Sequence, residues 1–281
     1  MNEIILNEKS LCGQYTSMDE FYRSILPFLA NVQYFVEDAS WEVLKKSDLF
    51  QSRVTERECF FRIRGDRSDA ARKIKGLLCR LSDEPPYWDM DSRQSGSYCA
   101  DGEDVTGSSV AEAAARTGFL LSFPRSAYED REFTVAHEEG EYRVTSISTP
   151  AYRMERLYQR GYCDIYTYLR EHFRGTRLNF DEFDAAYGFD SFERSEIEEC
   201  IADFERFAGH ADWREIKADS ALYCKEYRPS KKENWFRGTK YADMTIYKFR
   251  CGNPKRCFGY REGDVFYALR TERDHKISDN G

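Results

Sequence analysis

The sequence predicts an α+β fold with three parts: an N-terminal mixed α+β domain over residues 1–150, a central helical segment over 151–210, and a small basic antiparallel β-sheet domain over 211–281. The first part mixes amphipathic helical runs with short apolar runs of strand length. The second part shows only helical spacing, and the third shows alternating strand runs joined by short turns. With 41% hydrophobic residues, this chain of 281 residues has enough apolar side chains for buried cores.

Capping motifs mark the helices expected in the N-terminal domain. Ser17 and Glu20 form a capping box ahead of an apolar stripe with helical spacing, and Pro27 is expected to kink or split that helix. Ser109 and Glu112 form a second capping box. The helices expected here begin at Ser17, Glu42, Ser68 and Ser109, and the last of them ends at Gly118.

Short runs of apolar and aromatic residues predict strands in the same domain. Glu139 and Gly140 supply a hairpin turn between two of these runs. The expected strands cover residues 58–64, 119–123, 133–136 and 142–147.

Residues 82–107 are rich in Pro, Ser, Asp and Gly and predict a long irregular connection. Such connections are uncommon in compact domains and are often functional. Carboxylates here offer oxygen ligands to a divalent metal, which makes this loop one alternative enzyme site. The acidic residues concerned are Asp89, Asp91, Asp101, Glu103 and Asp104.

The central segment reads as helices separated by glycines. A helix over 152–173 is expected to break at Gly161, a short helix is expected to end at Gly188, and a third is expected to end at Gly209. The capping pairs expected for the last two helices are Asn179 with Glu182, and Ser195 with Glu198.

The C-terminal part is rich in strand patterns. The turns between its last three strands are short, so the sheet is expected to be an antiparallel meander. Apolar and basic residues alternate along these strands, which predicts one face in the core and one partly basic face. The expected strands cover residues 221–227, 244–250, 256–261 and 264–270.

Charge is unevenly distributed along the chain. The whole chain carries 42 Lys and Arg against 50 Asp and Glu, a formal net charge of −8. Residues 221–281 carry 14 against 8, a net charge of +6, which leaves 28 against 42, a net charge of −14, for residues 1–220. A basic end on an acidic body suits either a nucleic-acid contact or an acid–base match with protein. The residues predicted to bind nucleic acid are Lys248, Arg250, Lys255, Arg256, Arg270 and Arg273.

Three residues of the same part are candidates for catalysis. Metal-free RNA cleavage needs a base for the 2′-hydroxyl, cations for the phosphate and an acid for the leaving oxygen. His275 titrates near neutral pH, Tyr260 can transfer a proton or stack on a base, and Arg261 is a cation. A zinc site formed by Cys251, Cys257 and His275 is a further alternative. No phosphate-binding glycine loop or metalloprotease motif occurs, so we expect neither a cofactor nor a metal.

The cysteines and the N-terminus bear on the cellular compartment. Nine cysteines are spread along the chain and no C-x-x-C pair occurs, which favours reduced thiols in the cytoplasm. The apolar run from Ile4 to Leu6 is far too short for a signal peptide, and no run is long enough to cross a bilayer. We therefore expect a cytoplasmic protein with no membrane partner.

Residues 244–276, MTIYKFRCGNPKRCFGYREGDVFYALRTERDHK, resemble the terminal hairpins of RelE/ParE-type bacterial toxins. The resemblance rests on a Phe-Arg strand, a basic strand and a hydrophobic last strand. It implies helices packed on an antiparallel sheet. It also implies either cleavage of messenger RNA by Arg, Lys and Tyr side chains or poisoning of gyrase. The toxins of this family are usually single domains, much shorter than this chain.

Two hypotheses of function follow from the sequence. The first is a bacterial cytoplasmic protein that engages RNA or DNA through its basic C-terminal sheet, as a toxin or phage-defence effector with metal-free ribonuclease activity. The second is a non-catalytic interaction subunit of a larger defence-type complex, in which the basic end meets an acidic protein surface. The high aromatic content, 15% of the residues, suits interface anchors in that second case.

Overall fold

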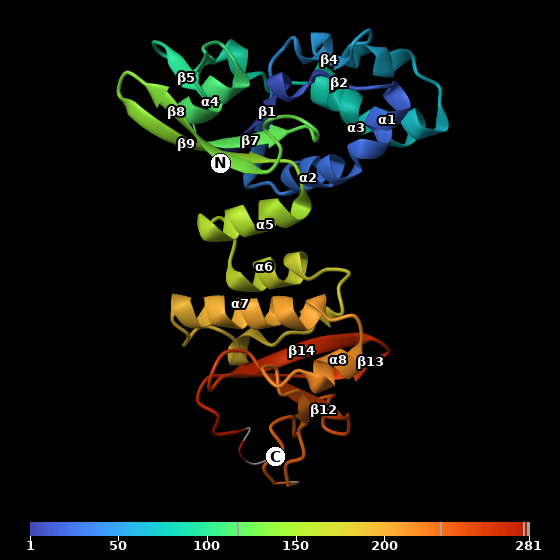
Figure 1. Cartoon of the computed structure of the whole chain (residues 1–281), viewed down its shortest axis with the longest axis vertical. Helices are drawn as coiled ribbons and strands as arrows, with labels where there is room; N and C mark the ends of the chain where they lie inside the picture. The colour runs from blue at the N-terminus through green and yellow to red at the C-terminus, as the bar shows by residue number, and fades with distance from the viewer. Residues whose placement is uncertain (117, 231, 278, 280–281) are drawn as a thin grey trace. The chain divides into compact units, whose positions relative to one another are not determined.

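The computed structural model describes residues 1–116, 118–230, 232–277 and 279, with the backbone alone for Lys73 (Figure 1). The chain divides into two compact units, residues 1–156 and residues 157–281. Helices and strands occur in both units, which confirms the α+β class predicted from the sequence. We refer to these as the N-terminal unit and the C-terminal unit.

A mixed seven-stranded sheet forms the centre of the N-terminal unit. Strands β3, β1, β7 and β9 are neighbours in parallel, and β8, β5 and β6 continue the sheet in antiparallel. A separate parallel pair joins β2 (Cys12–Tyr15) to β4 (Arg53–Thr55). The strands of the large sheet, in spatial order, are Trp41–Leu44, Asn2–Asn7, Phe119–Ser122, Gly140–Ile147, Arg131–His137, Tyr98–Ala100 and Glu103–Asp104.

Strands β3 and β1, at one side of this sheet, were not expected from the sequence. Ile4, Ile5 and Leu6 of β1 are fully buried, as befits a strand that is covered on both faces. The predicted helix over 42–50 is wrong, because Trp41–Leu44 forms edge strand β3 and only Leu49–Gln51 forms a single 3-10 turn, η2.

Helices cover both faces of the large sheet. Helix α4 packs Val110 and Ala111 against Ile5 of β1, whereas α2 stacks Phe28 on Phe123 at the opposite face (Figure 1). The helices of this unit are η1 Glu8–Ser10, α1 Met18–Ser24, α2 Leu26–Glu37, η2 Leu49–Gln51, η3 Phe60–Gly65, α3 Asp69–Asp83, η4 Trp88–Met90 and α4 Ser109–Ala115. Helix α5 (Pro150–Gln159) spans the boundary between the two units.

The cap predicted at Ser17 is confirmed, and a serine also caps α3. The Ser17 hydroxyl accepts the N–H of Glu20 at the start of α1, and Ser68 caps α3 in the same way. The helix is split as Pro27 predicted, since α1 ends at Ser24 and α2 begins at Leu26.

The cap of α4 differs from the prediction by one residue. The N-cap is Ser108, and its hydroxyl makes no capping bond. Instead, the half-buried carboxylate of Glu8, just after β1, accepts the backbone N–H of Ser109 at 3.1 Å. An acidic side chain from a distant segment thus neutralises the positive end of the helix.

The predicted strand over 58–64 is also wrong. Residues Phe60–Gly65 form the 3-10 helix η3, in which Phe60 and Ile63 are buried while Phe61 between them is exposed. A spacing of three residues between buried side chains is that of a 3-10 turn rather than a strand.

The connection over 82–107 is not structureless. It contains η4, β5 and β6, and buried Trp88 donates its indole N–H to the hydroxyl of Ser109 at 3.2 Å. The Pro-rich part of the loop therefore anchors the start of α4.

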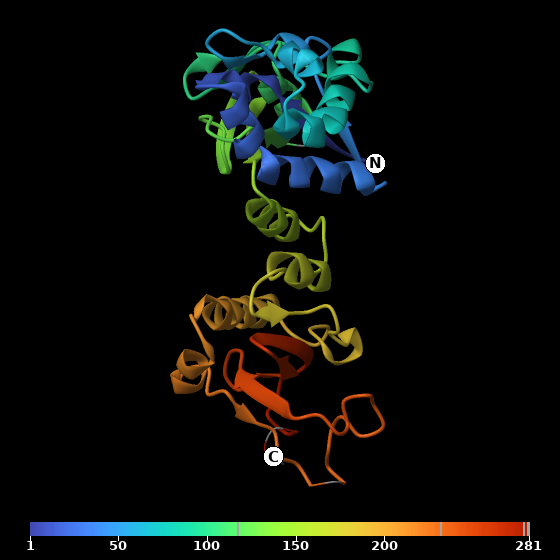
Figure 2. The same ribbon diagram turned by 90° about the vertical axis from the view of Figure 1, so that its right-hand side faces the viewer.

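The C-terminal unit is a five-stranded sheet with helix α7 across one face (Figures 1 and 2). Phe204 and Phe207 of α7 pack on Phe249 and Phe266 of the sheet, with Phe207 and Phe249 rings 4.6 Å apart. The elements are α6 Ile165–His172, β10 Leu178–Asn179, η5 Ala185–Tyr187, α7 Arg194–Gly209, α8 Trp213–Ala218, β11 Lys225–Glu226, β12 Ile246–Arg250, β13 Arg256–Glu262 and β14 Val265–Glu272.

The meander of β12, β13 and β14 is antiparallel, as predicted. The sheet is completed by β11 beside β12 and by β10, which runs parallel to β14. The predicted strand over 221–227 is reduced to Lys225–Glu226, because only these two residues pair with β12.

The helices of the second unit follow the predicted glycine breaks but not the predicted caps. Helix α5 ends before Gly161 and α6 begins after it, as expected. The capping box of α7 is made by Glu193 and Glu196 rather than by Ser195 and Glu198. The short turn η5 is capped by Asp184 instead of Asn179.

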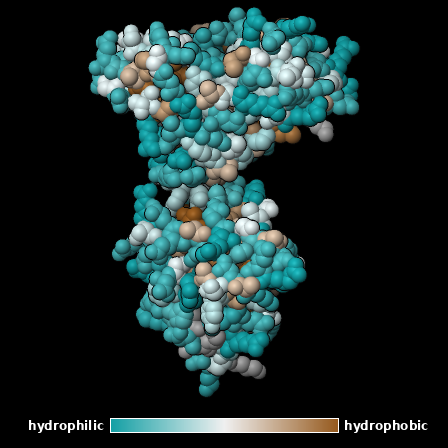
Figure 3. All heavy atoms as spheres, in the orientation of Figure 1, coloured by the Kyte–Doolittle hydropathy of each residue, from teal (hydrophilic) through white to brown (hydrophobic). Residues whose placement is uncertain are grey.

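Hydrophilic side chains dominate the visible surface of each unit, and the hydrophobic residues on it form only small groups (Figure 3). Among the described residues, none of the helices combines the length and the apolar character needed to cross a bilayer. All nine cysteines are free.

A glycine at the β13 bulge is required by its neighbours. A Cβ atom at Gly259 would lie 2.1 Å from the carbonyl oxygen of Tyr267 and 2.7 Å from the ring of Phe266. We expect Gly259→Ala to lower the free energy of unfolding by about 2–3 kcal/mol, because the backbone of β14 must move. The midpoint of urea unfolding, followed by circular dichroism, measures this change.

The matched control is Gly209→Ala, at the end of α7, where a Cβ would meet no atom within 4 Å. It is expected to stabilise the protein by about 0.5 kcal/mol, because alanine loses less backbone entropy in a helix. Equal effects of the two substitutions would contradict the clash at Gly259.

Candidate functional site

The register of the meander places most of the predicted cations on one face. Ile246, Tyr260 and Tyr267 are opposite one another, as are Lys248, Phe258 and Arg270 in the next row. This face is opposite to the one that α7 covers, because Phe249 and Phe266 point the other way. We call it the basic face, defined by Lys248, Arg250, Arg256 and Arg270.

Arg261 does not belong to the basic face. Its guanidinium lies 4.5 Å from the ring centroid of Trp213, which packs on the same side of the sheet as Phe266. Its Nε donates to the carbonyl oxygen of Gly263 at 2.7 Å. The candidate catalytic residues Tyr260 and Arg261 therefore project from opposite faces.

The basic face is covered by protein. A segment containing Tyr227, Trp235 and Phe236 folds over it, and the exposed fraction is 2% for Lys248 and 7% for Arg270. These cations therefore contact protein rather than solvent, and in this conformation they offer little surface to a phosphate.

Arg270 holds the covering segment in place. Its guanidinium lies 4.0 Å from the ring centroid of Tyr187 and 5.3 Å from that of Trp235, and it donates to the carbonyl oxygen of Trp235 at 2.7 Å. Asp184 lies 3.4 Å from the same guanidinium. Desolvated cation–π contacts of this kind stabilise by about 2 kcal/mol or more.

The other cations of the basic face also have protein contacts. The ammonium of Lys248 lies 5.5 Å from the ring centroid of Tyr227, and Arg256 donates to the carbonyl oxygens of Pro254 and Lys255. Burial, with the positive charges of neighbouring cations, lowers the pKa of Lys248 to about 8. The guanidinium carbon of Arg250 lies 5.9 Å from the centroid of the Tyr223 ring.

Lys255 and Arg273 pair with carboxylates of helix α7. The ammonium of Lys255 is 2.8 Å from Glu199, and the guanidinium of Arg273 is 2.8 Å from Glu196. Burial alone would lower the pKa of Lys255, but the hydrogen bond and charge of Glu199 outweigh it and raise that pKa.

These ion pairs show how the positive charge of residues 221–281 is balanced within the C-terminal unit. Residues 157–220 carry 8 Lys and Arg against 15 Asp and Glu, a net charge of −7. Together with the +6 of residues 221–281, the C-terminal unit has a formal net charge of only −1. The acid–base match weighed from the sequence thus occurs in part within one unit, and the basic end is largely neutralised by its own helices.

Tyr260 belongs to a tyrosine cluster centred on a carboxylate. Its hydroxyl donates to Glu182 at 3.2 Å, and Tyr241 donates to the same carboxylate at 2.8 Å, with Lys240 at 3.1 Å. The ring of Tyr267 stacks on Tyr260 with centroids 4.9 Å apart.

The protonation of this cluster is fixed at neutral pH. The hydrogen bond from Tyr241 lowers the pKa of Glu182. Burial, and then the negative charge of Glu182, raise the pKa of Tyr260 to about 12. Tyr260 is therefore a neutral phenol held by a carboxylate, which favours a stacking role over one as a base.

His275 lies beyond the end of β14 in a left-handed backbone conformation, with φ of +64°. Its Nδ1 is 2.5 Å from the carboxylate of Asp279. Within the described part of the chain, no hydrogen bond or ion pair joins His275 to Tyr260 or Arg261. The three candidate catalytic residues are thus not brought together as one acid–base site.

The alternative metal sites receive no support from the geometry. Cys251 and Cys257 are buried, and burial raises the pKa of both thiols, which disfavours the thiolate that zinc requires. In the acidic loop, Asp89 binds Ser47 and Asp101 pairs with Arg131. The described residues contain no group of three or more His, Cys, Asp or Glu side chains placed to hold a metal.

Exposed cations gather in residues 225–244 of the C-terminal unit, which we call the β11–β12 segment. This segment includes Tyr227, Trp235 and Phe236, which cover the basic face. The exposed cations were not among the residues predicted to bind nucleic acid, and all of them except Lys225 lie outside the predicted strands. Several cations in a stretch that also holds Pro, Ser, Asn and Gly is the signal that would have found them. The exposed cations of this segment are Lys225, Arg228, Lys232, Arg237 and Lys240.

Comparison of the chain with protein-family models, curated proteins and solved structures finds no match. The assignment of function therefore rests on the geometry of the chain itself.

The lowered pKa of Lys248 predicts a pH-dependent stability. The folded protein binds fewer protons than the unfolded chain between pH 8 and pH 10.5, so this residue makes stability rise as pH increases through that window. We expect Lys248→Met to raise the free energy of unfolding by about 2 kcal/mol at pH 7, and the gain to shrink from pH 8 upward until little of it remains at pH 10.5. Urea unfolding of both proteins at each pH measures the difference.

The tyrosines also titrate near pH 10, but they are common to both proteins and cancel in the comparison. A difference that stays constant from pH 7 to pH 10.5 would show that the Lys248 charge is not the cause.

Proposed function

We propose that the C-terminal unit binds RNA or DNA through the β11–β12 segment rather than through the cations of its strands. The observation that carries this proposal is the set of exposed cations in that segment, next to half-buried aromatic rings. Cations neutralise the phosphate backbone, and aromatic rings stack on unpaired bases, so their combination suits single-stranded nucleic acid.

The cations of the β11–β12 segment differ in whether a protein carboxylate or ring already contacts them. Among the described residues, Lys232 and Arg237 are exposed and make no ion pair. Lys225 lies 5.0 Å from the ring centroid of Tyr223, whereas Arg228 and Lys240 pair with carboxylates. Those exposed pairs are weak and can exchange for a phosphate at little cost.

Aromatic side chains provide the stacking surface. Tyr223 is 53% exposed, and Trp235, Tyr241 and Tyr267 are half-buried around the same segment. Tyr241, Tyr260 and Tyr267 stack in series, and Glu182 fixes the hydroxyls of the first two. Base stacking on such rings contributes about 1–3 kcal/mol per base.

The proposed activity is binding of nucleic acid. Its proposed biological role is that of a toxin or phage-defence effector. The resemblance of residues 244–276 to RelE/ParE-type toxins supports a nucleic-acid target. Ribonuclease chemistry is left out, because Tyr260 and Arg261 project from opposite faces of the sheet and, among the described residues, no hydrogen bond or ion pair joins His275 to either.

A second candidate function is that of an interaction subunit in a larger complex. The internal pairing of strand cations, together with a formal net charge of −7 for the N-terminal unit, favours a protein partner over a polyanion. Under this reading, we expect the chain to co-purify from its native host with one protein in stoichiometric amount after nuclease treatment. Nucleic acid without a protein partner would contradict it.

Removal of the exposed cations tests the nucleic-acid proposal. We expect the triple variant Lys225→Ala, Lys232→Ala, Arg237→Ala to bind single-stranded RNA at least tenfold more weakly at low salt. The slope of log affinity against log salt should fall by about 2, because three phosphate contacts are lost. Fluorescence anisotropy with a labelled oligonucleotide over a salt series measures both quantities.

The matched control removes three exposed cations from the N-terminal unit: Lys9→Ala, Arg57→Ala and Arg67→Ala. It changes the net charge equally and should leave affinity and slope unchanged. Equal losses in the two triple variants, or no binding by the native chain at low salt, would reject the proposed surface.

A further inference from the structure

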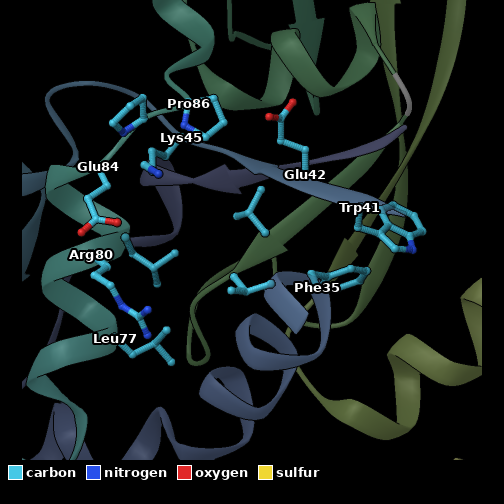
Figure 4. A pocket seen from close by; sticks show the side chains of 12 residues that line it. Phe35, Trp41, Glu42, Lys45, Leu77, Arg80, Glu84 and Pro86 are labelled. Atoms are coloured by element: carbon cyan, nitrogen blue, oxygen red, sulfur yellow. The ribbon is translucent and has the colours of Figure 1, made fainter. Parts of the chain in front are cut away.

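A cleft in the N-terminal unit, separate from the proposed nucleic-acid surface, has the features of a small-molecule site (Figure 4). It lies between α2, α3 and edge strand β3 and has a volume of about 230 Å³. Sites for drug-sized ligands are about 300–1,000 Å³, so this cleft suits a smaller molecule. Figure 4 shows one wall formed by Lys45, Glu84, Arg80 and Leu77, and Phe35 and Trp41 on the other side.

Lys45 is a buried cation without a charged partner. Its exposed fraction is 4%, and among the described residues its ammonium makes no hydrogen bond or ion pair. The ammonium lies 5.5 Å from the centroid of the Tyr87 ring. Burial lowers the pKa of Lys45, and the negative charges of Glu84 and Glu42 partly oppose this effect. A buried ammonium is costly unless an anion pairs with it, so the cleft favours a ligand with a negative group.

The edge of β3 adds backbone groups to the same cleft. The N–H of Lys45 donates to Pro86 and its carbonyl oxygen accepts from Trp88, so residue 45 bonds away from β1. Strand residues alternate in direction, and Val43 therefore also turns its N–H and carbonyl oxygen away from β1. Within the described residues these two groups have no hydrogen-bond partner, and Val43 lines the cleft.

The remaining lining is apolar on one side and acidic at the rim. Phe35, Trp41 and Leu77 offer a surface for a hydrophobic side chain, while Glu84 offers negative charge for an ammonium group. A ligand that satisfies all of these groups carries a carboxylate, an ammonium and an apolar side chain within a short distance of one another.

We propose that this cleft binds a free amino acid with an apolar side chain. The carboxylate pairs with the ammonium of Lys45, the amino group lies toward Glu84, and the side chain fills the space between Phe35, Trp41 and Leu77. The backbone N–H of Val43 is available to the second carboxylate oxygen. This site lies in a different unit from the proposed nucleic-acid surface and does not depend on it.

Calorimetric titration of the full chain with L-leucine and L-phenylalanine tests the proposal. We expect at least one of them to bind. Two analogues of the second, 3-phenylpropionate without the ammonium and phenethylamine without the carboxylate, should bind at least tenfold more weakly. No heat and no thermal stabilisation with either amino acid at millimolar concentration would overturn the proposal.

A matched pair of variants assigns binding to the cleft. Lys45→Met should weaken amino-acid binding at least tenfold, whereas Lys46→Met, at the neighbouring lysine that pairs with Asp48, should leave it unchanged. Leu77→Trp, which fills the cleft without removing a charge, should abolish binding even if Lys45→Met fails to fold. Unchanged affinity in Lys45→Met or Leu77→Trp would contradict the site.

Titration with a short peptide distinguishes a free amino acid from the C-terminus of a peptide, which has the same carboxylate and side chain. The tripeptide glycyl-glycyl-phenylalanine lacks an ammonium at the same position and should bind more weakly than L-phenylalanine. Tighter binding of the tripeptide would reject the free amino acid as the ligand.

Discussion

The C-terminal unit depends on one constraint, namely that a cation leaves water only where protein replaces the lost hydration. Arg270 meets this requirement with three aromatic rings, a carbonyl oxygen and Asp184, and it thereby fastens the covering segment onto the sheet. Lys255 and Arg273 meet it with carboxylates of α7, which tie that helix to the sheet at a second place. These cations are therefore part of the architecture, whereas the proposed contact with a polyanion uses the exposed cations of the β11–β12 segment.

In the N-terminal unit, the same requirement for replacement of lost hydration applies to carboxylates. Glu112, in the first turn of α4, is fully buried and accepts hydrogen bonds from Arg116 and from the backbone N–H of Arg93. Glu8 is half-buried at the same end of that helix and accepts the backbone N–H of Ser109. Among the described buried charges of this unit, the ammonium of Lys45 alone makes no hydrogen bond or ion pair, and this distinguishes the cleft beside β3 from the rest of the unit.

Local features were predictable from the sequence, whereas features that depend on distant partners were not. Ser17, Ser68 and Pro27 act on their own helices, and the C-terminal meander has short turns, so neighbouring residues contain the whole signal. Strands β1 and β3 pair in parallel across two helices, and an apolar run as short as Ile4–Leu6 does not reveal such a partner. The alternation of apolar and basic residues correctly predicted that Lys248 lies on the face of the sheet opposite α7. It gave no indication of the segment that covers Lys248 on that face.

Helix α5 has a consequence for how the two units can be separated genetically. Its ten residues, Pro150–Gln159, cross the boundary at residues 156 and 157, and both Met154 and Leu157 on it are buried. A gene truncated between residues 156 and 157 would divide this helix, and each product would keep only part of its hydrogen-bonded backbone. An expression boundary for either unit is therefore better placed outside residues 150–159 than at the division itself.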